Sequence, residues 1–574
     1  MNIKTLRVEI LMAGAMAAGC VVCAAQDAAS PASSPANYSG TLSPTEEMAQ
    51  LRALLAAQQR QLDTLQQTIE RILVDKNVAP ASPRPPMHPS LGSVASLTPV
   101  IPGLAALPAA IPALPRHLTP LASTAAESNP CEAAPDTQTV PPYLRVGNVC
   151  IIPNGFVDLT AVWRDKNTAS GLGDNFASVP YNNVTAGKLS EFRLSSQFSR
   201  LGFRADSDWK DTHFIFFNEF DFLGNSGTNN LGVTAGAFVP RLRLFWVDAR
   251  KGRWEVLGGQ SWSLLTPNRS GLSPLPSDLF YTQSTDTSYV VGLAWTRQAG
   301  IRVVYHAGRT ITAGVALENP DQYIGGSGGL SATAVTLPAA TALSGIGGTQ
   351  ADNSTNVLNT PNLLPDIIAK IAFDPGRRFH FEAGGIARTF KIQNSATNTA
   401  STKPGSGLLV GGNLEIVKNV HLISTNFWSD GGGRYLFGQA PDFIVRANGS
   451  ISPIHAGGTV DGLEARMRSW LLYGYYGGAY IGRDTALDAN GTTKIGYGYA
   501  NSSNTNNRAI QEITVGLNHT LWIDPRYGAI NVMGQYEWLT RDPWSVLTGA
   551  PKATHDNTVY MDFRYTLPGV MPRF

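Results

Sequence analysis

Charged side chains recur at alternate positions in several segments of this sequence. Glu219 and Asp221 form one such pair, and Arg241 and Arg243 form another. Side chains two residues apart in a β-strand point to the same side, so each pair would concentrate charge on one face. Fixed charges of this kind attract, orient or repel ions. The chemistry that they suggest is electrostatic selection.

The elements that carry these pairs show a two-residue period over the last three quarters of the chain. At 558–565, Val559, Met561 and Phe563 alternate with polar or charged residues, which predicts a strand whose two faces meet different surroundings. We predict sixteen strands, at 155–164, within 190–206, and at 213–222, 240–250, 254–260, 300–306, 310–318, 365–373, 379–390, 407–417, 420–428, 455–464, 470–481, 509–523, 529–541 and 557–565.

The connections between these strands alternate in length. Tight turns are predicted at 251–252, 307–308, 374–376, 418–419 and 524–528. Long polar or glycine-rich loops are predicted at 166–189, 319–362, 391–406, 429–454 and 482–508. Short turns that alternate with long loops are typical of a bacterial outer-membrane barrel. The prediction is an all-β fold, a transmembrane antiparallel β-barrel of sixteen strands over residues 150–574, embedded in outer-membrane lipid.

Tryptophans lie near the ends of the predicted strands, as expected for an aromatic girdle at a membrane surface. In the strand at 240–250, Leu242, Leu244 and Trp246 are predicted to face away from Arg241 and Arg243. The alternative is that the tryptophans pack in the core of a sandwich. The girdle residues are predicted to be Trp163, Trp246, Trp428, Trp470, Trp522 and Trp538.

The N-terminus reads as an export signal over residues 1–25. Lys4 and Arg7 precede an apolar stretch, and small residues follow to Ala25. A lipobox ending at Cys20 is the alternative. Removal of the signal leaves Cys131 and Cys150, which in an exported chain can form one disulfide or remain two free thiols. No other segment has the apolar run of about 18 residues that a membrane-spanning helix needs.

Residues 43–76 are predicted to form a coiled-coil helix. Ser43 is a good N-cap, Pro44 and Glu46 suit the first turn, and apolar residues then follow at heptad spacing. Isoleucine at both kinds of seam position near its end, Ile69 and Ile72, favours three chains over two. A helix packed on its own domain is the alternative. A Pro/Ala-rich linker is predicted at 77–142. We place both segments in the periplasm, where a contact with peptidoglycan is a further hypothesis.

Composition limits the partners. The net charge is +2 and only 15% of the residues are charged, so no strong overall field favours nucleic acid. No His-Glu-x-x-His motif or metal-ligand cluster occurs. A barrel lipase would need a serine beside His306 or His519 on adjacent strands. We therefore predict no enzymatic activity, no cofactor and no metal.

The predicted loop after the strand at 254–260 runs to about Trp295 and carries Arg269 and Asp278. A loop at this place in a sixteen-stranded barrel can fold inward and narrow the lumen. From the phase of the strands we predict that ten further charged residues line this lumen: Arg193, Glu219, Asp221, Arg241, Arg243, Arg302, Glu382, Arg388, Glu512 and Glu537.

The chain from about Ser43 to its end resembles the DcaP-like trimeric outer-membrane porins. The resemblance rests on the order of the features above and on four short stretches, at 199–203, 259–263, 317–320 and 365–370. Phe574 fits the terminal aromatic that assists barrel assembly, although Pro568 and Pro572 depart from the pattern. The resemblance implies a homotrimer and passive diffusion of small polar or anionic solutes.

Two roles remain open for the predicted lumen arginines. A positive wall would favour anions, or the arginines would pair with lumen carboxylates and hold the wall and the inward loop together. Two other functions also remain open for the whole protein. One is a structural or adhesive envelope protein with a plugged barrel, and the other is a soluble, secreted β-protein.

Overall fold

The computed structural model describes residues 144–174, 176–224, 239–275, 279–284, 289–326, 335–339, 363–394, 399–524 and 526–568. All of them belong to the second of two compact units, Pro112–Phe574. The predicted signal segment, coiled coil and linker all lie outside the described residues. No helix in the described part of the chain is long and apolar enough to cross a membrane.

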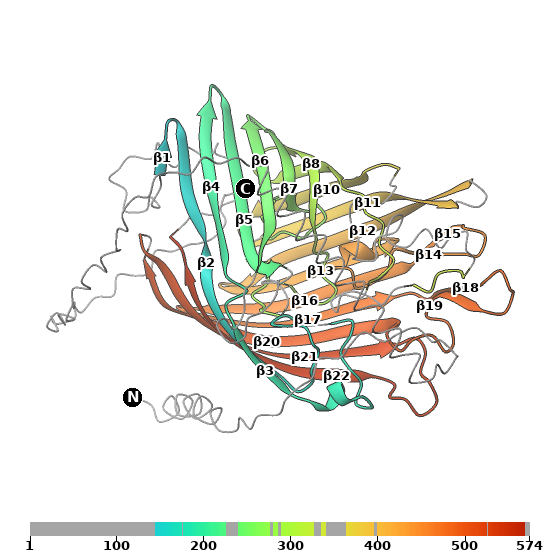
Figure 1. Cartoon of the computed structure of the whole chain (residues 1–574). Helices are drawn as coiled ribbons and strands as arrows, with labels where there is room; N and C mark the ends of the chain where they lie inside the picture. Colours follow the sequence, from blue (N-terminus) through green and yellow to red (C-terminus); the bar gives the residue numbers. More distant parts are fainter. Residues whose placement is uncertain are drawn as a thin grey trace, which may run out of the picture. The chain divides into compact units, whose positions relative to one another are not determined.

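One antiparallel sheet wraps into a barrel (Figure 1). Its strands are β1 (Leu144–Val146), β2 (Val149–Arg164), β3 (Glu191–Ser195), β4 (Arg200–Trp209), β5 (Thr212–Gly224), β6 (Val239–Lys251), β7 (Trp254–Trp262), β8 (Arg297–His306), β9 (Ile311–Glu318), β10 (Asp366–Gly376), β11 (Phe379–Asn394), β12 (Thr399–Val417), β13 (Val420–Asp430), β16 (His455–Met467), β17 (Trp470–Ile481), β20 (Asn507–Asp524), β21 (Gly528–Pro543) and β22 (Thr554–Thr566).

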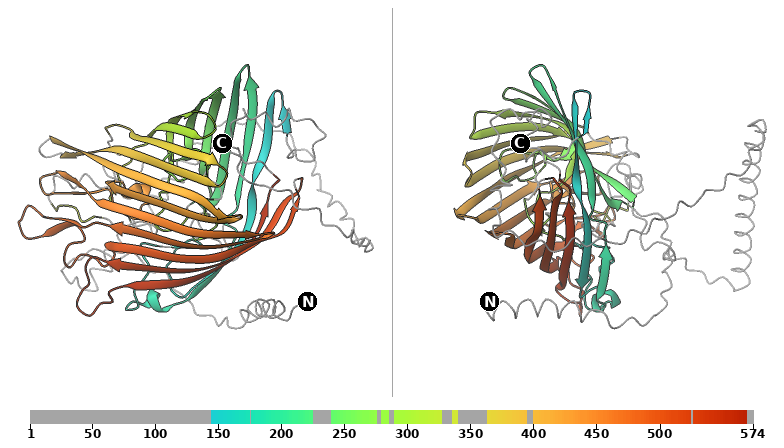
Figure 2. Two further views of the ribbon diagram at one scale, coloured as in Figure 1. Left: turned by 180° about the vertical axis from the view of Figure 1, so that it is seen from behind. Right: turned by 90° about the vertical axis from the view of Figure 1, so that its left-hand side faces the viewer.

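The barrel closes through β2, which pairs with β22 on one side and with β3 and β4 on the other. Because β3 and β4 follow one another along β2, they occupy one position, and β1 is a short strand at the start of β2. The result is a closed barrel of sixteen strands, as predicted. Figure 2 shows these strands from behind and from the side.

The two faces of the barrel differ as the two-residue period predicted. On β22, Val559, Met561 and Phe563 point outward and are 38–48% exposed, whereas Asp562 and Arg564 point inward and are buried. Outward apolar side chains recur on the other strands, among them Leu159, Phe245, Ile301, Ile371 and Val515. An apolar outward face suits lipid, while the inward face carries the charge.

The prediction for the outward face of β6 was wrong at two positions. Leu244 and Trp246 are buried inside the barrel, and Phe245 is exposed instead. The register explains the difference: Glu219 pairs with Leu244 and Phe220 pairs with Leu242, so Arg243 is the extra residue of a β-bulge. Trp246 stacks on Phe217 and is not part of a girdle.

Four of the other predicted girdle tryptophans, Trp163, Trp428, Trp470 and Trp522, are 40–55% exposed, and Trp538 is half-buried.

Three of the predicted loops contain strand residues, one through longer barrel strands and two through additional hairpins. Residues 391–406 belong largely to β11 and β12, which pair as far as Asn394 and Thr399. Two small hairpins also form in the long connections, β14 (Phe443–Val445) with β15 (Ile451–Pro453) and β18 (Asp484–Leu487) with β19 (Lys494–Tyr497). The extended ends of β11 and β12 are mainly polar and hold only one large apolar residue, the buried Ile392, so their alternation is too weak for a strand to be predicted.

Candidate functional site: the charged interior of the barrel

An arginine cluster lies on the inner wall across β4, β5 and β6. We define it as Arg200, Arg241 and Arg243 with Glu219 and Asp221. Arg241 donates two hydrogen bonds to the Asp221 carboxylate, at 3.0 and 2.6 Å. Arg243 bridges both carboxylates, at 2.6 Å to Glu219 and 2.8 Å to Asp221. Arg200 lies 3.9 Å from Glu219, so three guanidinium groups contact the same two carboxylates.

Strand register brings these residues together. Asp221 pairs directly with Arg200 on β4 and with Arg241 on β6, and opposite charges at paired positions stabilise a sheet. The bulge turns Arg243 inward beside Glu219. The side chain of Arg243 is almost fully buried, whereas that of Arg241 keeps 36% of its surface exposed. Only Arg241 of these two can therefore contact a solute in water.

The described residues of the connection between β7 and β8, which are 263–275, 279–284 and 289–296, lie against the inner wall, and we call them the inner segment. Its backbone amides donate to wall carboxylates: Leu264 to Glu318 at 2.8 Å, Asn268 to Glu382 at 3.1 Å and Gly271 to Asp374 at 3.0 Å. Lys370 adds a hydrogen bond to the Thr266 carbonyl at 2.7 Å. Such charge-assisted hydrogen bonds are the stronger ones, so they fix the segment along β9–β11.

The inner segment also contacts the opposite part of the wall. Arg269 forms an ion pair with Glu464 of β16 at 2.5 Å, Ser284 donates to Glu537 of β21 at 2.6 Å, and the Val291 amide donates to Glu512 of β20 at 2.8 Å. These anchors lie on strands distant from β9–β11 in the sheet. The described residues of the segment therefore contact two separate groups of wall strands, β9–β11 and β16–β21.

Arg269 carries a buried charge that its partner stabilises. Burial disfavours the charged guanidinium, but the nearby carboxylate of Glu464 offsets that effect and raises the pKa of Arg269 above its ordinary value. The guanidinium also lies 5.3 Å from the ring centre of Tyr281. Arg269 is thus a fixed positive anchor and not a freely exposed cation.

Glycines allow the inner segment to rest directly on the wall. Gly292 has φ +87°, and a Cβ atom there would lie 2.1 Å from the carbonyl oxygen of Gly478. A Cβ atom on Gly458 would likewise meet the Gly292 carbonyl oxygen at 2.1 Å. Backbone meets backbone at this contact, so a side chain on either surface would push the segment away from β16 and β17.

A second connection also fills part of the interior. Residues 431–454 contribute Tyr435, Leu436, Phe443 and Ile444 to a buried apolar cluster, which they share with Leu265, Phe280, Val290 and Trp295 of the inner segment. Tyr435 donates to Asp366 at 2.9 Å, and its backbone carbonyl accepts from Trp295. Burial raises the pKa of Asp442 in this connection, although the charge of Arg388 opposes that shift.

The ten strand residues predicted for the lumen all lie on the inward face, and most of them are ion-paired. Arg302 lies 3.5 Å from Glu255, Arg388 contacts Asp366 at 3.0 Å and Asp442 at 2.8 Å, and Glu382 contacts Lys370 at 2.8 Å. Arg193 pairs with Glu191 and is 43% exposed.

Of the other predicted residues, Asp278 and Cys131 lie outside the described residues. Cys150 forms a disulfide, and no group of three His, Cys, Asp or Glu side chains in the described part of the chain could hold a metal ion.

The prediction missed several partners of these residues: Arg200, Glu318, Asp366, Lys370, Asp442 and Glu464. Glu318 and Asp366 lie at the ends of the predicted strands, where the two-residue period is short. Arg200 lies within the segment predicted at 190–206, where the break between β3 and β4 interrupts the period. Lys370 and Glu464 alternate with outward apolar neighbours, so strand phase could have placed them inward. Their pairing with the inner segment had no signal in the sequence.

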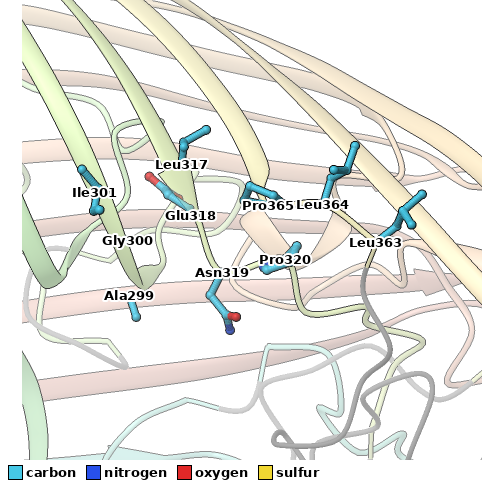
Figure 3. A pocket seen from close by; sticks show the side chains of 10 residues that line it. All are labelled: Ala299, Gly300, Ile301, Leu317, Glu318, Asn319, Pro320, Leu363, Leu364 and Pro365. Carbon is cyan, nitrogen blue, oxygen red and sulfur yellow. The ribbon is translucent and has the colours of Figure 1, made fainter.

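A mainly apolar groove lies on the wall of the barrel, and Glu318 and Asn319 are its polar lining residues (Figure 3). It has a volume of about 470 Å³ and is lined by residues of β8, β9 and the chain before β10. Ile301, Leu317, Leu363 and Leu364 are each about half exposed there. An outward groove with this lining fits hydrocarbon better than a polar solute.

Comparison with solved structures identifies a known fold. The outer membrane channel DcaP of Acinetobacter baumannii aligns with a TM-score of 0.53 and 17% identity, over 74% of this chain and 99% of that chain. The barrel has the fold of this channel. An anion-selective porin from Comamonas acidovorans aligns less well, with a TM-score of 0.42, 14% identity, and coverage of 73% of this chain and 100% of that one. No family model and no curated protein sequence matches the chain.

Proposed function

We propose that this protein is an outer-membrane porin through which small polar solutes, chiefly anions, diffuse passively. The observation that carries the proposal is the closed sixteen-stranded barrel with an apolar outward face and a charged inward face. This arrangement suits a protein that meets lipid outside and water inside. Its fold is that of a solved outer-membrane channel.

Anion preference follows from which charges remain available to a solute. Glu318, Glu382 and Glu512 accept hydrogen bonds from the inner segment and are buried. By contrast, the side chains of Arg193 and Arg241 are 43% and 36% exposed. Positive side chains that reach water in a confined, low-dielectric passage raise the local concentration of anions. In this proposal the inner segment narrows the passage.

The same proposal assigns the location and assembly. The barrel resides in the outer membrane, and the N-terminal helix and linker extend into the periplasm, where they contact peptidoglycan. The heptad pattern of residues 43–76 supports a homotrimer. Each subunit then contributes one passage, so a single assembly has three equivalent conducting units.

Planar bilayer recordings test the proposal. We expect refolded or extracted full-length protein to insert in events of three equal conductance levels, with a reversal potential in a salt gradient that reports anion preference. Folded protein that inserts without conductance would contradict a porin. Protein that remains in the soluble fraction of cells, and not in extracted outer membranes, would contradict the location.

A plugged barrel with a structural role is the second candidate. The observation that favours it is the buried apolar cluster formed inside the barrel by the inner segment and residues 431–454. Such a cluster excludes water and solutes from the volume that it fills. Deletion of residues 434–452 distinguishes the candidates: a porin conducts before the deletion, whereas a plugged barrel conducts only after it.

A further inference from the structure

The short connections of the barrel carry cations and no acidic residues over a long stretch of its rim. Four consecutive tight turns of the barrel, between β8 and β17, comprise residues 307–310, 377–378, 418–419 and 468–469. Each turn contains at least one Lys or Arg, and none contains Asp or Glu. We define the basic rim as one exposed cation from each turn: Arg309, Arg377, Lys418 and Arg468.

Nearby carboxylates do not neutralise the basic rim. Its four side chains form no ion pair with another described residue. The acidic residues that precede two of the turns have other partners: Asp374 is buried and contacts His380 at 2.8 Å, and Glu415 contacts Arg378 at 3.3 Å. The rim therefore presents a net positive charge to its surroundings.

The cations lie at the edge of the apolar outward face. Two residues from each of them is a large apolar side chain that is 38–53% exposed: Ile311, Phe379, Ile416 and Trp470. At about 3.3 Å per residue, each cation is within roughly 7 Å of that edge. Lys and Arg side chains can lay their apolar stems along such a surface and keep the charged group in the polar layer. The basic rim is thus at the depth of lipid headgroups.

The lengths of the connections assign the rim to the periplasmic side. In outer-membrane barrels the short turns are periplasmic and the longer loops are extracellular. The turn at 307–310 is short, whereas the connection from β9 to β10 covers residues 319–365. Neighbouring strands are about 4.8 Å apart, so turns that join successive pairs of strands are roughly 10 Å apart. Each cation can therefore contact a headgroup of its own.

We propose that the basic rim binds the phosphate groups of anionic phospholipids in the periplasmic leaflet. The inference rests on the outer-membrane location in the proposed function and adds which lipid the barrel selects. Ammonium and guanidinium groups donate charge-assisted hydrogen bonds to phosphate oxygens. The net positive charge favours headgroups with a net negative charge over zwitterionic ones. The adjacent apolar side chains contact acyl chains, which a free phosphate ion lacks.

The test measures which lipid surrounds the full-length protein in vesicles. Protein is refolded into mixtures of phosphatidylcholine and phosphatidylglycerol in which one lipid has brominated acyl chains, and quenching of tryptophan fluorescence gives the relative binding constant of the two lipids. Trp470, two residues from Arg468, is a reporter close to the rim. We expect wild type to bind phosphatidylglycerol about fivefold more tightly than phosphatidylcholine. A variant in which glutamine replaces all four rim cations should lose most of this preference.

The matched control replaces four exposed lysines at the long-loop end of the barrel, through Lys188→Gln, Lys403→Gln, Lys494→Gln and Lys552→Gln. It removes the same charge and should keep the wild-type preference. Heat-modifiable mobility on gels reports that each barrel has folded. In about 1 M salt, where the screening length is about 3 Å, wild type should lose the preference too. Equal binding of both lipids to wild type at low salt, or an equal loss in the control, would overturn the proposal.

Conductance in bilayers of phosphatidylcholine separates this result from the proposed function. Wild type that conducts there but does not prefer phosphatidylglycerol would overturn the basic rim and support the porin. A preference for phosphatidylglycerol in a folded barrel that does not conduct would support the basic rim and overturn the porin.

Discussion

Arg241 and Arg243 lie two residues apart on β6, but their side chains have different environments. Arg241 is partly exposed to the interior, whereas Arg243 is buried between Glu219 and Asp221. We expect Arg241→Ala to shift the reversal potential in a salt gradient toward cation preference, because it removes an accessible positive charge. Lys251→Ala is the control, since it removes the same charge from the exposed end of β6. An equal shift in both variants would argue against a local role for Arg241.

Replacement of Arg243 should affect stability more than selectivity. Arg243→Met leaves two buried carboxylates without a shared partner, and removal of one member of a buried ion pair costs about 3–5 kcal/mol. Urea titration of the folded fraction, followed by gel mobility, measures the free energy of unfolding. Addition of Glu219→Gln and Asp221→Asn to Arg243→Met should recover much of the loss. No recovery would point to lost packing of the side chain instead of lost charge pairing.

At the scale of the elements, strand phase was predictable and departures from it were not. The alternation of Val559, Met561 and Phe563 with polar residues assigned both faces of β22 correctly. On β6 the bulge at Arg243 shifts the phase, so Leu244 and Trp246 turn inward. A bulge depends on the register with β5, which no single segment encodes. For the same reason the route of the inner segment depends on distant carboxylates such as Glu512.

The contact between Gly292 and β17 makes a prediction about the inner segment. We expect Gly292→Ala to lower the free energy of unfolding by about 1–3 kcal/mol. The added methyl group must push the backbone of the inner segment away from the backbone of β17. Gly308→Ala is a matched control: its φ of +98° is also left-handed, but its Cβ would have no neighbour within 4 Å. Both variants carry similar backbone strain, so the difference between them in urea titrations measures the close approach. If both variants lose the same free energy of unfolding, the inner segment can shift away from the wall at no cost.

For the whole molecule, sixteen strands and a closed barrel could be predicted from the sequence. Each strand carries its own alternation of apolar and polar residues, and each tight turn contains residue types that favour turns. The degree to which the interior is filled was beyond such local patterns. Tyr435, Leu265 and Val290 come from two connections and form one buried cluster only inside the finished barrel. Strand phase predicted which charged side chains point inward. It could not predict their ion-pair partners, because those partners depend on where the two connections contact the wall.

Assembly is the property of the whole molecule that the N-terminal segment is expected to govern. We predict that deletion of residues 43–76 lowers the stability of the proposed trimer and leaves the barrel folded. In this proposal the heptad positions join three chains in a coiled coil, whereas the barrel strands pair within one chain. Light scattering of the extracted protein across a dilution series measures the loss, and heat-modifiable gel mobility reports the barrel. Deletion of an equal length of the linker, residues 84–117, is the control and should leave dissociation unchanged. A deletion of residues 43–76 that dissociates at the same concentration as the control would place all of the assembly energy in the barrel walls.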